Sequence, residues 1–258
     1  MHFMTHVLRK ILSLAMLVLM IGQASAQDDK AERMLFVGNS FTFFWNTPQL
    51  VEAMALDQGV NLDAYQSTVG GSNLQQHWEG EKGTVTRKRL DEEQWDVVVL
   101  QGYSTSAISK KERLHTFGGK FIDEVRDKKA EPVLYMTWAY DSNPLMQEEI
   151  AKEYLAMAKE YKVKVIPAGL VWQKARTLRP DLELFFDDKH QSPDGTYLNA
   201  LLIYKTLTGK SVAEIPNRLY TTTADGEKLY LCFVLPETGK FLRDLVEGFD
   251  VEKYNFTN

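Results

Sequence analysis

The stretch Leu35-Phe36-Val37-Gly38-Asn39-Ser40-Phe41-Thr42 decides the fold of this chain. An apolar run is followed by a glycine and a serine, and an aromatic-rich segment typical of a helix start comes next. A strand-to-helix turn of this kind lifts the Ser40 hydroxyl to the carboxyl edge of a sheet, where α/β proteins place their ligand sites. The same residues also suit a plain turn into an N-capped helix, so the stretch alone leaves a nucleophile and a structural turn both open.

Apolar segments and amphipathic segments alternate along the rest of the chain. The apolar runs predicted as strands are 34–37, 62–67, 96–101, 132–138 and 163–167. The amphipathic stretches predicted as helices are 49–58, 110–128, 147–161, 170–178 and 194–207. Continuous apolar strands separated by helices indicate a parallel sheet covered on both faces. We expect a C-terminal extension of irregular or extended structure over 216–234, before a last helix near 238–248.

The first 26 residues are typical of an export signal. Arg9 and Lys10 precede an apolar segment over 11–21, and the small residues Ala24-Ser25-Ala26 follow it. The apolar core is too short for a comfortable membrane span, although an uncleaved anchor is the alternative. We therefore predict a signal peptide over 1–26, a single domain over 27–258, and a secreted or periplasmic protein with no membrane contact after cleavage.

Charge and cysteine content exclude several classes of function. The formal net charge is −5, and removing the two basic residues of the signal makes it −7. A mildly acidic chain is not expected to have nucleic acid or anionic lipid as its main partner. Cys232 is the only cysteine, so no intrachain disulfide can form, and its apolar surroundings predict a buried, inert thiol. Without a cysteine cluster and with few histidines, the chain offers no structural zinc site.

A nucleophilic serine needs a base, and His190 is the histidine best placed in the sequence to act as one. His115 lies in a charged helical stretch and is predicted to be solvated. His190 precedes Ser192-Pro193, which predicts a capped helix start and a rigid loop before it. Asp187 could then accept a hydrogen bond from His190 and leave the other ring nitrogen free for Ser40, as in a Ser-His-Asp triad. The alternative is that Asp187 and Asp188 are acidic residues near a helix start and that His190 is an ordinary loop histidine.

The blocks Gly38-Asn39-Ser40 and Asp187-x-x-His190 resemble the first and last motifs of the SGNH (GDSL-like) hydrolases. They stand in the right order after the expected strands, so the resemblance covers most of the chain beyond the signal. Gly-Asn-Ser stands where Gly-Asp-Ser is commoner. The resemblance implies a flavodoxin-like three-layer α/β/α sandwich with a central parallel sheet of about five strands, a serine esterase mechanism, and no cofactor or metal.

The resemblance also implies an oxyanion hole made of a glycine N–H and an asparagine side chain. The glycine block matches at Gly71, with Gly70 as the alternative register and a flexible turn as the structural alternative. The asparagine block departs from the family pattern, since the chain has Gln101-Gly102-Tyr103-Ser104 where Gly-x-Asn-Asp is expected. In this Leu-Gln-x-x-Ser variant, Gln101 is the predicted replacement donor and Ser104 the second choice.

Aromatic residues near these blocks suggest a substrate cleft. His77 and Trp78 follow the glycine block, Tyr103 lies within the block 101–104, and Trp138 ends a predicted strand. Such rings suit stacking on sugars, while core packing is the equal alternative for Trp138. Substrate selection is expected in the loops around 103–109, 140–146 and 180–186.

Three functions remain open from the sequence. The leading one is a serine esterase acting on a small-molecule or polysaccharide ester, by analogy a carbohydrate O-acetyl esterase. A lipid-type esterase or thioesterase is the second, and the aromatic cluster 41–45 supports it. A non-catalytic carbohydrate-binding protein is the third; the missing asparagine supports it, and the presence of Ser40, Asp187 and His190 together opposes it.

Overall fold

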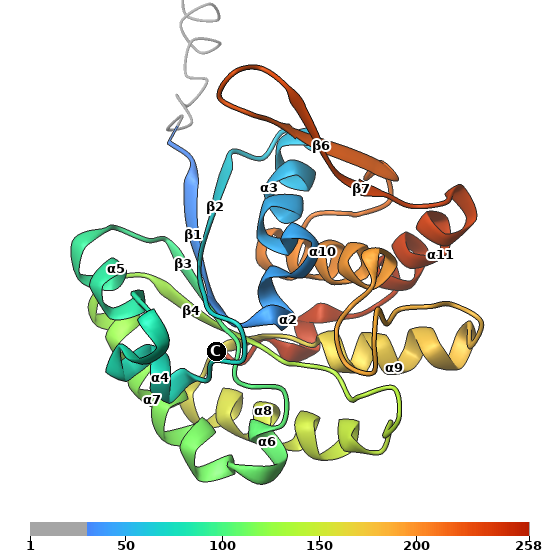
Figure 1. The fold of residues 1–258 in the computed structure, drawn as a ribbon. Helices are drawn as coiled ribbons and strands as arrows, with labels where there is room; N and C mark the ends of the chain where they lie inside the picture. The colour runs from blue at the N-terminus through green and yellow to red at the C-terminus, as the bar shows by residue number, and fades with distance from the viewer. Residues whose placement is uncertain (1–29, 258) are drawn as a thin grey trace, which may run out of the picture. The chain divides into compact units, whose positions relative to one another are not determined.

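A five-stranded parallel sheet organises the chain, in the strand order β2-β1-β3-β4-β5 (Figure 1). The computed structural model describes residues 30–257, so the predicted signal peptide lies outside the described residues. The strands are β1 (Glu32–Gly38), β2 (Leu62–Thr68), β3 (Val97–Leu100), β4 (Glu131–Tyr135) and β5 (Lys164–Ile166). Every neighbouring pair is parallel, which confirms the predicted sheet and its number of strands.

The strands are apolar throughout because both faces of the sheet are buried. In β1, Met34 and Phe36 pack into one core while Leu35 and Val37 pack into the other, and none of the four is exposed to solvent. Successive side chains of a strand point to opposite faces, so one continuous apolar run supplies two cores. The cores on the two faces are therefore built from the same few strands.

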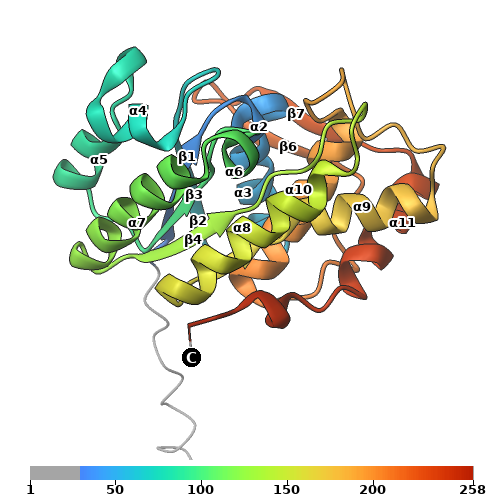
Figure 2. The same cartoon turned by 90° about the horizontal axis from the view of Figure 1, so that it is seen from below.

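Helices form a layer on each face of the sheet (Figures 1 and 2). One layer contains α3 (Thr47–Asp57), α9 (Ala168–Leu178), α10 (Pro193–Thr208) and α11 (Pro236–Glu247). The other contains α4 (Leu74–Glu79), α5 (Thr86–Glu92), α6 (Ser106–Ser109), α7 (Lys111–Asp127) and α8 (Met146–Tyr161). This is the predicted three-layer α/β/α sandwich. Within residues 30–257, none of the helices has the length and apolar character to cross a membrane.

The structure adds elements that the apolar patterns did not predict. Helices α4 and α5 are short and largely polar, so they lack the periodicity that marks a longer amphipathic helix. The segment expected to be irregular or extended contains an antiparallel hairpin of β6 (Arg218–Thr222) and β7 (Lys228–Phe233). The remaining short helical turns are α2 (Ser40–Phe43), η1 (Phe44–Asn46), η2 (Glu81–Gly83) and η3 (Val251–Tyr254).

The carboxyl ends of β1 and β3 lie side by side at the point where the winding of the chain reverses. The connection from β1 to β2 runs through α3 on one face, whereas the connection from β2 to β3 runs through α4 and α5 on the other. Open α/β sheets bind their ligands at such a switch point. Ser40 follows β1 and Gln101 follows β3, so the topology brings both residues to this crevice.

Gly38, the last residue of β1, has no room for a side chain. A Cβ atom there would collide with the Gln101 side chain and with the Thr42 hydroxyl. We predict that Gly38→Ala lowers the free energy of unfolding by about 1–3 kcal/mol, because overpacking forces this buried turn to shift. Urea denaturation measures the change.

Gly248→Ala is the matched control for that experiment. Gly248 has a φ of −80°, which suits any residue, and an added Cβ would come no closer than 3.4 Å to a neighbouring atom. Its effect should stay within about 0.5 kcal/mol. Equal losses in the two variants would contradict the steric argument.

Candidate active site

Ser40 is the first residue of α2, directly after the carboxyl end of β1. Asn39 caps this short helix, and its Oδ1 accepts the Phe41 N–H at 3.0 Å. The Asn39 Nδ2 group also donates to the Ser72 carbonyl at 2.9 Å. The turn is therefore the N-capped helix start that the sequence allowed, and its hydrogen bonds hold Ser40 at the crevice.

Gln101 supports this turn from the end of β3. Its Oε1 accepts the Asn39 N–H at 2.9 Å and the Thr42 hydroxyl at 2.8 Å, while its Nε2 donates to the Gly102 carbonyl. The residue is only 1% exposed. Because Gln101 is buried and is not among the residues that line the cavity over Ser40, its amide supports the turn and does not face the crevice. The prediction of Gln101 as an oxyanion donor is corrected accordingly.

Ser40, His190 and Asp187 form a continuous chain of hydrogen-bond contacts. Ser40 Oγ lies 2.9 Å from His190 Nε2, and His190 Nδ1 lies 2.8 Å from Asp187 Oδ2. The other carboxylate oxygen, Asp187 Oδ1, accepts the backbone N–H groups of Lys189 at 2.8 Å and of His190 at 2.7 Å. The structure thus brings together the three residues that the sequence proposed as a triad, in the order that proton transfer from the serine requires.

The Asp187 carboxylate is held in its ionised form. Partial burial raises the pKa of Asp187, but the hydrogen bonds from the His190 ring and from two backbone N–H groups outweigh it and bring the pKa to about 2. An ionised carboxylate keeps the proton of neutral His190 on Nδ1. The Nε2 lone pair then faces the Ser40 hydroxyl and can accept its proton.

The loop that carries Asp187 and His190 is fixed at its end by α10. Ser192 is the N-cap of this helix; its Oγ accepts the Gly195 N–H at 3.1 Å and donates to the Glu183 carbonyl at 2.7 Å. Inside the loop, the Phe186 N–H donates to the His190 carbonyl at 2.8 Å. The cap predicted from Ser192-Pro193 is confirmed, and it holds the histidine loop closed.

A small cavity of about 280 Å³ opens over Ser40. Its walls are Asn39, Ser40, Phe41, Gly71, Tyr103, Ser104, Lys189 and His190. Gly71 has a φ of +65°, a left-handed conformation that favours glycine. Among the hydrogen bonds between residues 30–257, none uses the N–H of Ser40 or of Gly71. Both residues line the cavity, so their backbone N–H groups are candidate donors for an oxyanion there.

Ser104, the second choice from the sequence, is among the residues that line this cavity. Its hydroxyl lies 2.9 Å from the Tyr140 hydroxyl. Neither Gly70, the alternative glycine, nor Gln101 lines the cavity. Tyr103, a predicted substrate contact, lines it and is 36% exposed. Among the described residues, no group of three or more His, Cys, Asp or Glu side chains is placed to share a metal ion.

His77 was expected to line the substrate cleft, but it is fully buried beneath the turn. Its Nε2 donates to the Gly38 carbonyl at 2.9 Å, and its Nδ1 accepts from the Thr86 hydroxyl at 2.6 Å. In α4, His77 shares the inward face with Leu74, three residues earlier. Trp78 lies half-buried under the Arg87 guanidinium, 4.2 Å from the ring centroid, and does not line the cavity either.

Trp138 is also an interior residue, as the core-packing alternative predicted. It is fully buried and stacks between Phe41 and Trp172, with ring centroids 4.6 Å and 4.5 Å away. Its indole N–H donates to the Lys189 carbonyl at 2.9 Å. Trp138 therefore connects the helix of the serine to the loop of the histidine, and it does not line the cavity over Ser40.

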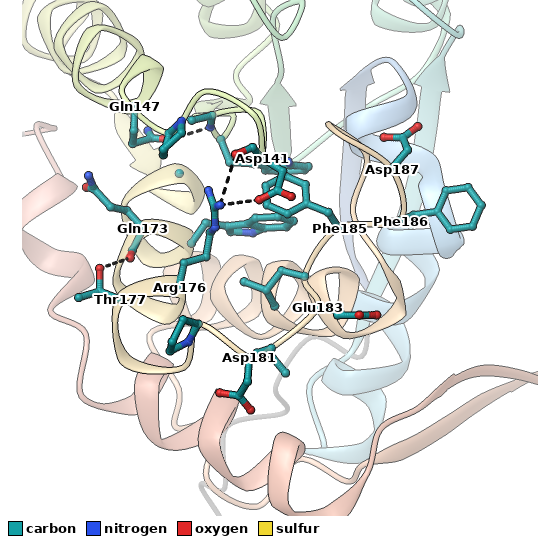
Figure 3. A pocket seen from close by; sticks show the side chains of 18 residues that line it. Asp141, Gln147, Gln173, Arg176, Thr177, Asp181, Glu183, Phe185, Phe186 and Asp187 are labelled. Carbon is teal, nitrogen blue, oxygen red and sulfur yellow. Dashed lines mark hydrogen bonds and ion pairs between the residues drawn. The ribbon is translucent and has the colours of Figure 1, made fainter.

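A larger cavity of about 790 Å³ borders the loop that carries Asp187 (Figure 3). Asp187 and Phe186 line it, whereas Ser40 and His190 line the smaller cavity. Arg176 forms an ion pair with Asp141 inside it. Its remaining polar lining includes Gln147, Gln173, Thr177, Asp181 and Glu183. Parts of the predicted selectivity loops 140–146 and 180–186 form these walls.

Solved structures have the same fold. A protein from Slackia heliotrinireducens assigned to the SGNH hydrolases matches with a TM-score of 0.60 and 22% identity, over 69% of this chain and 100% of its own. A DUF4886 family protein from Bacteroides uniformis matches with a TM-score of 0.66 and 20% identity, over 84% and 94% of the two chains. An acetyl xylan esterase matches with a TM-score of 0.56 and 15% identity, over 68% and 99%.

No protein-family model and no curated protein sequence matches the chain. The structural likeness shows that the chain has the fold of the SGNH hydrolases, as its motifs predicted. At these identities the likeness concerns the fold alone.

His77 makes stability depend on pH. Burial lowers the pKa of His77 to about 4, against the opposing effect of its hydrogen bond to the Gly38 carbonyl; the ordinary value is 6.5. Between these values the unfolded chain binds a proton that the folded chain does not. The stabilisation is therefore complete above pH 6.5 and is lost as the pH falls toward 4, by about 3 kcal/mol.

Urea denaturation of the protein and of His77→Gln across pH 4–7 measures this effect. The difference in unfolding free energy between the two proteins should shrink as the pH falls through the window. A difference in unfolding free energy that stays constant with pH would contradict the lowered pKa of His77.

Loss of the Gln101 side chain should lower stability, whereas loss of the Ser104 hydroxyl should lower catalytic activity. Gln101→Ala leaves two buried donors without a partner, so the free energy of unfolding should fall by about 2 kcal/mol or more. Ser104→Ala should change this free energy by less than 1 kcal/mol and lower kcat on an ester substrate by about tenfold or more. Urea denaturation and ester kinetics on both variants measure these effects. A stable Gln101→Ala variant with a selective loss of kcat would show that Gln101 is the oxyanion donor after all.

Proposed function

We propose that this protein is a serine esterase that works through an acyl-enzyme. The observation that carries the proposal is the hydrogen-bonded sequence Ser40–His190–Asp187 at a cavity lined by Ser40 and Gly71. A nucleophile, a base, an orienting acid and an oxyanion site are the parts that acyl transfer requires.

The proposed reaction has two halves. Ser40 Oγ attacks the ester carbonyl and gives its proton to His190 Nε2, while the carbonyl oxygen gains negative charge facing the N–H groups of Ser40 and Gly71. The intermediate collapses, and the departing alcohol takes the proton from His190. Water then attacks the acyl-Ser40 ester by the same path and releases the acid. Asp187 orients and stabilises the imidazolium throughout.

The size of the cavity supports a short acyl group. About 280 Å³ lies over Ser40, and its lining is partly polar, with Ser104 and Lys189 among the walls. This space suits an acetyl group and part of an alcohol better than a long acyl chain. Further support comes from an acetyl xylan esterase with the same fold, and from the export signal pattern of the first 26 residues. We therefore propose a secreted or periplasmic carbohydrate O-acetyl esterase that acts without a cofactor.

A lipid-type esterase or thioesterase is the second candidate, favoured by one observation. Phe44 packs 4.4 Å from the His190 ring, between ring centroids, and large apolar side chains beside it are exposed. An acyl chain could lie on such a surface. The length of acyl chain that the protein accepts separates the two candidates.

The test is hydrolysis of p-nitrophenyl acetate, butyrate and octanoate by the protein and by three variants. Ser40→Ala and His190→Ala should each lower kcat by about 10³-fold or more, and Asp187→Asn by about 10²-fold or more. The value of kcat/KM should fall by about tenfold or more from acetate to octanoate, and acetylated xylan should release acetate.

Three results would contradict the proposal in different ways. Turnover that survives in Ser40→Ala excludes this serine as the nucleophile. A preference for octanoate replaces the carbohydrate esterase with the lipid-type enzyme. A folded protein that hydrolyses none of the esters favours the non-catalytic binding protein.

A further inference from the structure

Trp45 has an unusual backbone conformation immediately beside the proposed site. Its φ is 52°, and the φ of Asn46 is 55°, so two consecutive non-glycine residues are left-handed. This region costs about 1–2 kcal/mol for a residue with a side chain, and it is rare for one as bulky as tryptophan. Strain of this kind is often retained where it serves a function.

The strained turn holds the Trp45 ring against the histidine loop. The indole N–H donates to the Gln191 carbonyl at 2.9 Å, one residue after His190. The ring also packs against Phe186, with centroids 5.7 Å apart and planes at 74°. Phe44 contacts both Phe186 and the His190 ring, at centroid distances of 6.5 and 4.4 Å.

These aromatic rings remain open to solvent even though they are well anchored. Trp45 is 42% exposed and Phe186 is 63% exposed. Core packing does not require this exposure, and adjoining exposed aromatic side chains commonly mark a binding surface. We refer to the two side chains as the Trp45–Phe186 platform.

We propose that the Trp45–Phe186 platform binds the pyranose ring of the alcohol part of an acetylated carbohydrate. This inference rests on the proposed function and deepens it. The departing alcohol must take its proton from His190, and Phe44 packs against both the His190 ring and Phe186, so the platform lies next to the residue that protonates the alcohol. A pyranose has an apolar C–H face that can lie on an aromatic ring, while its hydroxyl groups point outward.

The larger cavity favours a sugar over an acyl chain on this platform. Phe186 borders this cavity as well, and the neighbouring lining carries Arg176, Asp181 and Glu183. These groups can bind the hydroxyls of a further sugar unit. An apolar acyl chain in this cavity would remove these polar groups from water without providing hydrogen bonds, which would cost binding free energy.

The test compares two acetyl esters that differ in the alcohol. Xylose tetraacetate contains a pyranose ring, whereas vinyl acetate contains none. For Phe186→Ala and Trp45→Ala, the ratio of kcat/KM on xylose tetraacetate to kcat/KM on vinyl acetate should fall about tenfold, mainly through KM, since one stacked ring contributes on this scale. Acetate release measures both reactions.

Two further variants make the comparison specific. Phe233→Ala is the matched control, because Phe233 is 67% exposed on β7, and its ratio should not change. Trp45→Phe keeps an aromatic face and loses the indole N–H, so it should retain most of the ratio.

Equal losses on both esters in Trp45→Ala and Phe186→Ala would show that the rings only support the loop, and would overturn the proposal. A selective loss on p-nitrophenyl octanoate would overturn it in favour of an acyl subsite.

A binding measurement separates failure of the platform from failure of the proposed function. Ser40→Ala is titrated with xylohexaose by calorimetry, alone and combined with Phe186→Ala or with Phe233→Ala. The Phe186 combination should raise Kd about fivefold or more and the Phe233 combination should not. If the parent protein hydrolyses neither acetyl ester, the esterase proposal fails while this titration still tests the platform. Equal Kd values in all three proteins would exclude the sugar subsite.

Discussion

The hydrogen bonds that the buried Gln101 side chain accepts are the constraint on which the site depends. They tie the turn after β1 to the end of β3, at the position where the sheet changes its direction of winding. Removing the acceptor would leave buried donors unsatisfied, at about 1–3 kcal/mol each. Gly38 has no side chain, which lets Gln101 approach the turn closely. His77, a residue of α4, donates a hydrogen bond to the Gly38 carbonyl. The position of Ser40 is therefore set by groups from three separate parts of the chain.

The histidine side of the site is built by similar means. Ser192 and the start of α10 close the loop, and the Asp187 carboxylate satisfies two of its backbone N–H groups while it orients the His190 ring. Trp138 joins the two sides, since it stacks on Phe41 next to Ser40 and donates to the carbonyl of Lys189 next to His190. A rigid aromatic contact and one hydrogen bond thus keep a serine and a histidine, 150 residues apart in sequence, at hydrogen-bond distance.

The features that followed from the sequence are those that short segments determine by themselves. Continuous apolar runs predict buried parallel strands, and Ser192-Pro193 predicts a helix start, because neither depends on distant residues. The direction of the Gln101 amide could not be predicted, since it depends on contacts with the turn after β1. The inward face of α4 could not be predicted either, because six residues show no clear period, so nothing in the sequence indicated that His77 is buried. The left-handed backbone of Trp45 has no sequence signal at all.

The central claim is that Ser40 is a nucleophile activated by His190. Labelling of the folded protein with a fluorophosphonate, followed by peptide mass spectrometry, tests it without any assumption about the substrate. We predict one adduct, on Ser40, that is absent from Ser40→Ala and forms about 100-fold or more slowly in His190→Ala. An adduct on a different serine, or labelling of Ser40 at an unchanged rate in His190→Ala, would contradict it.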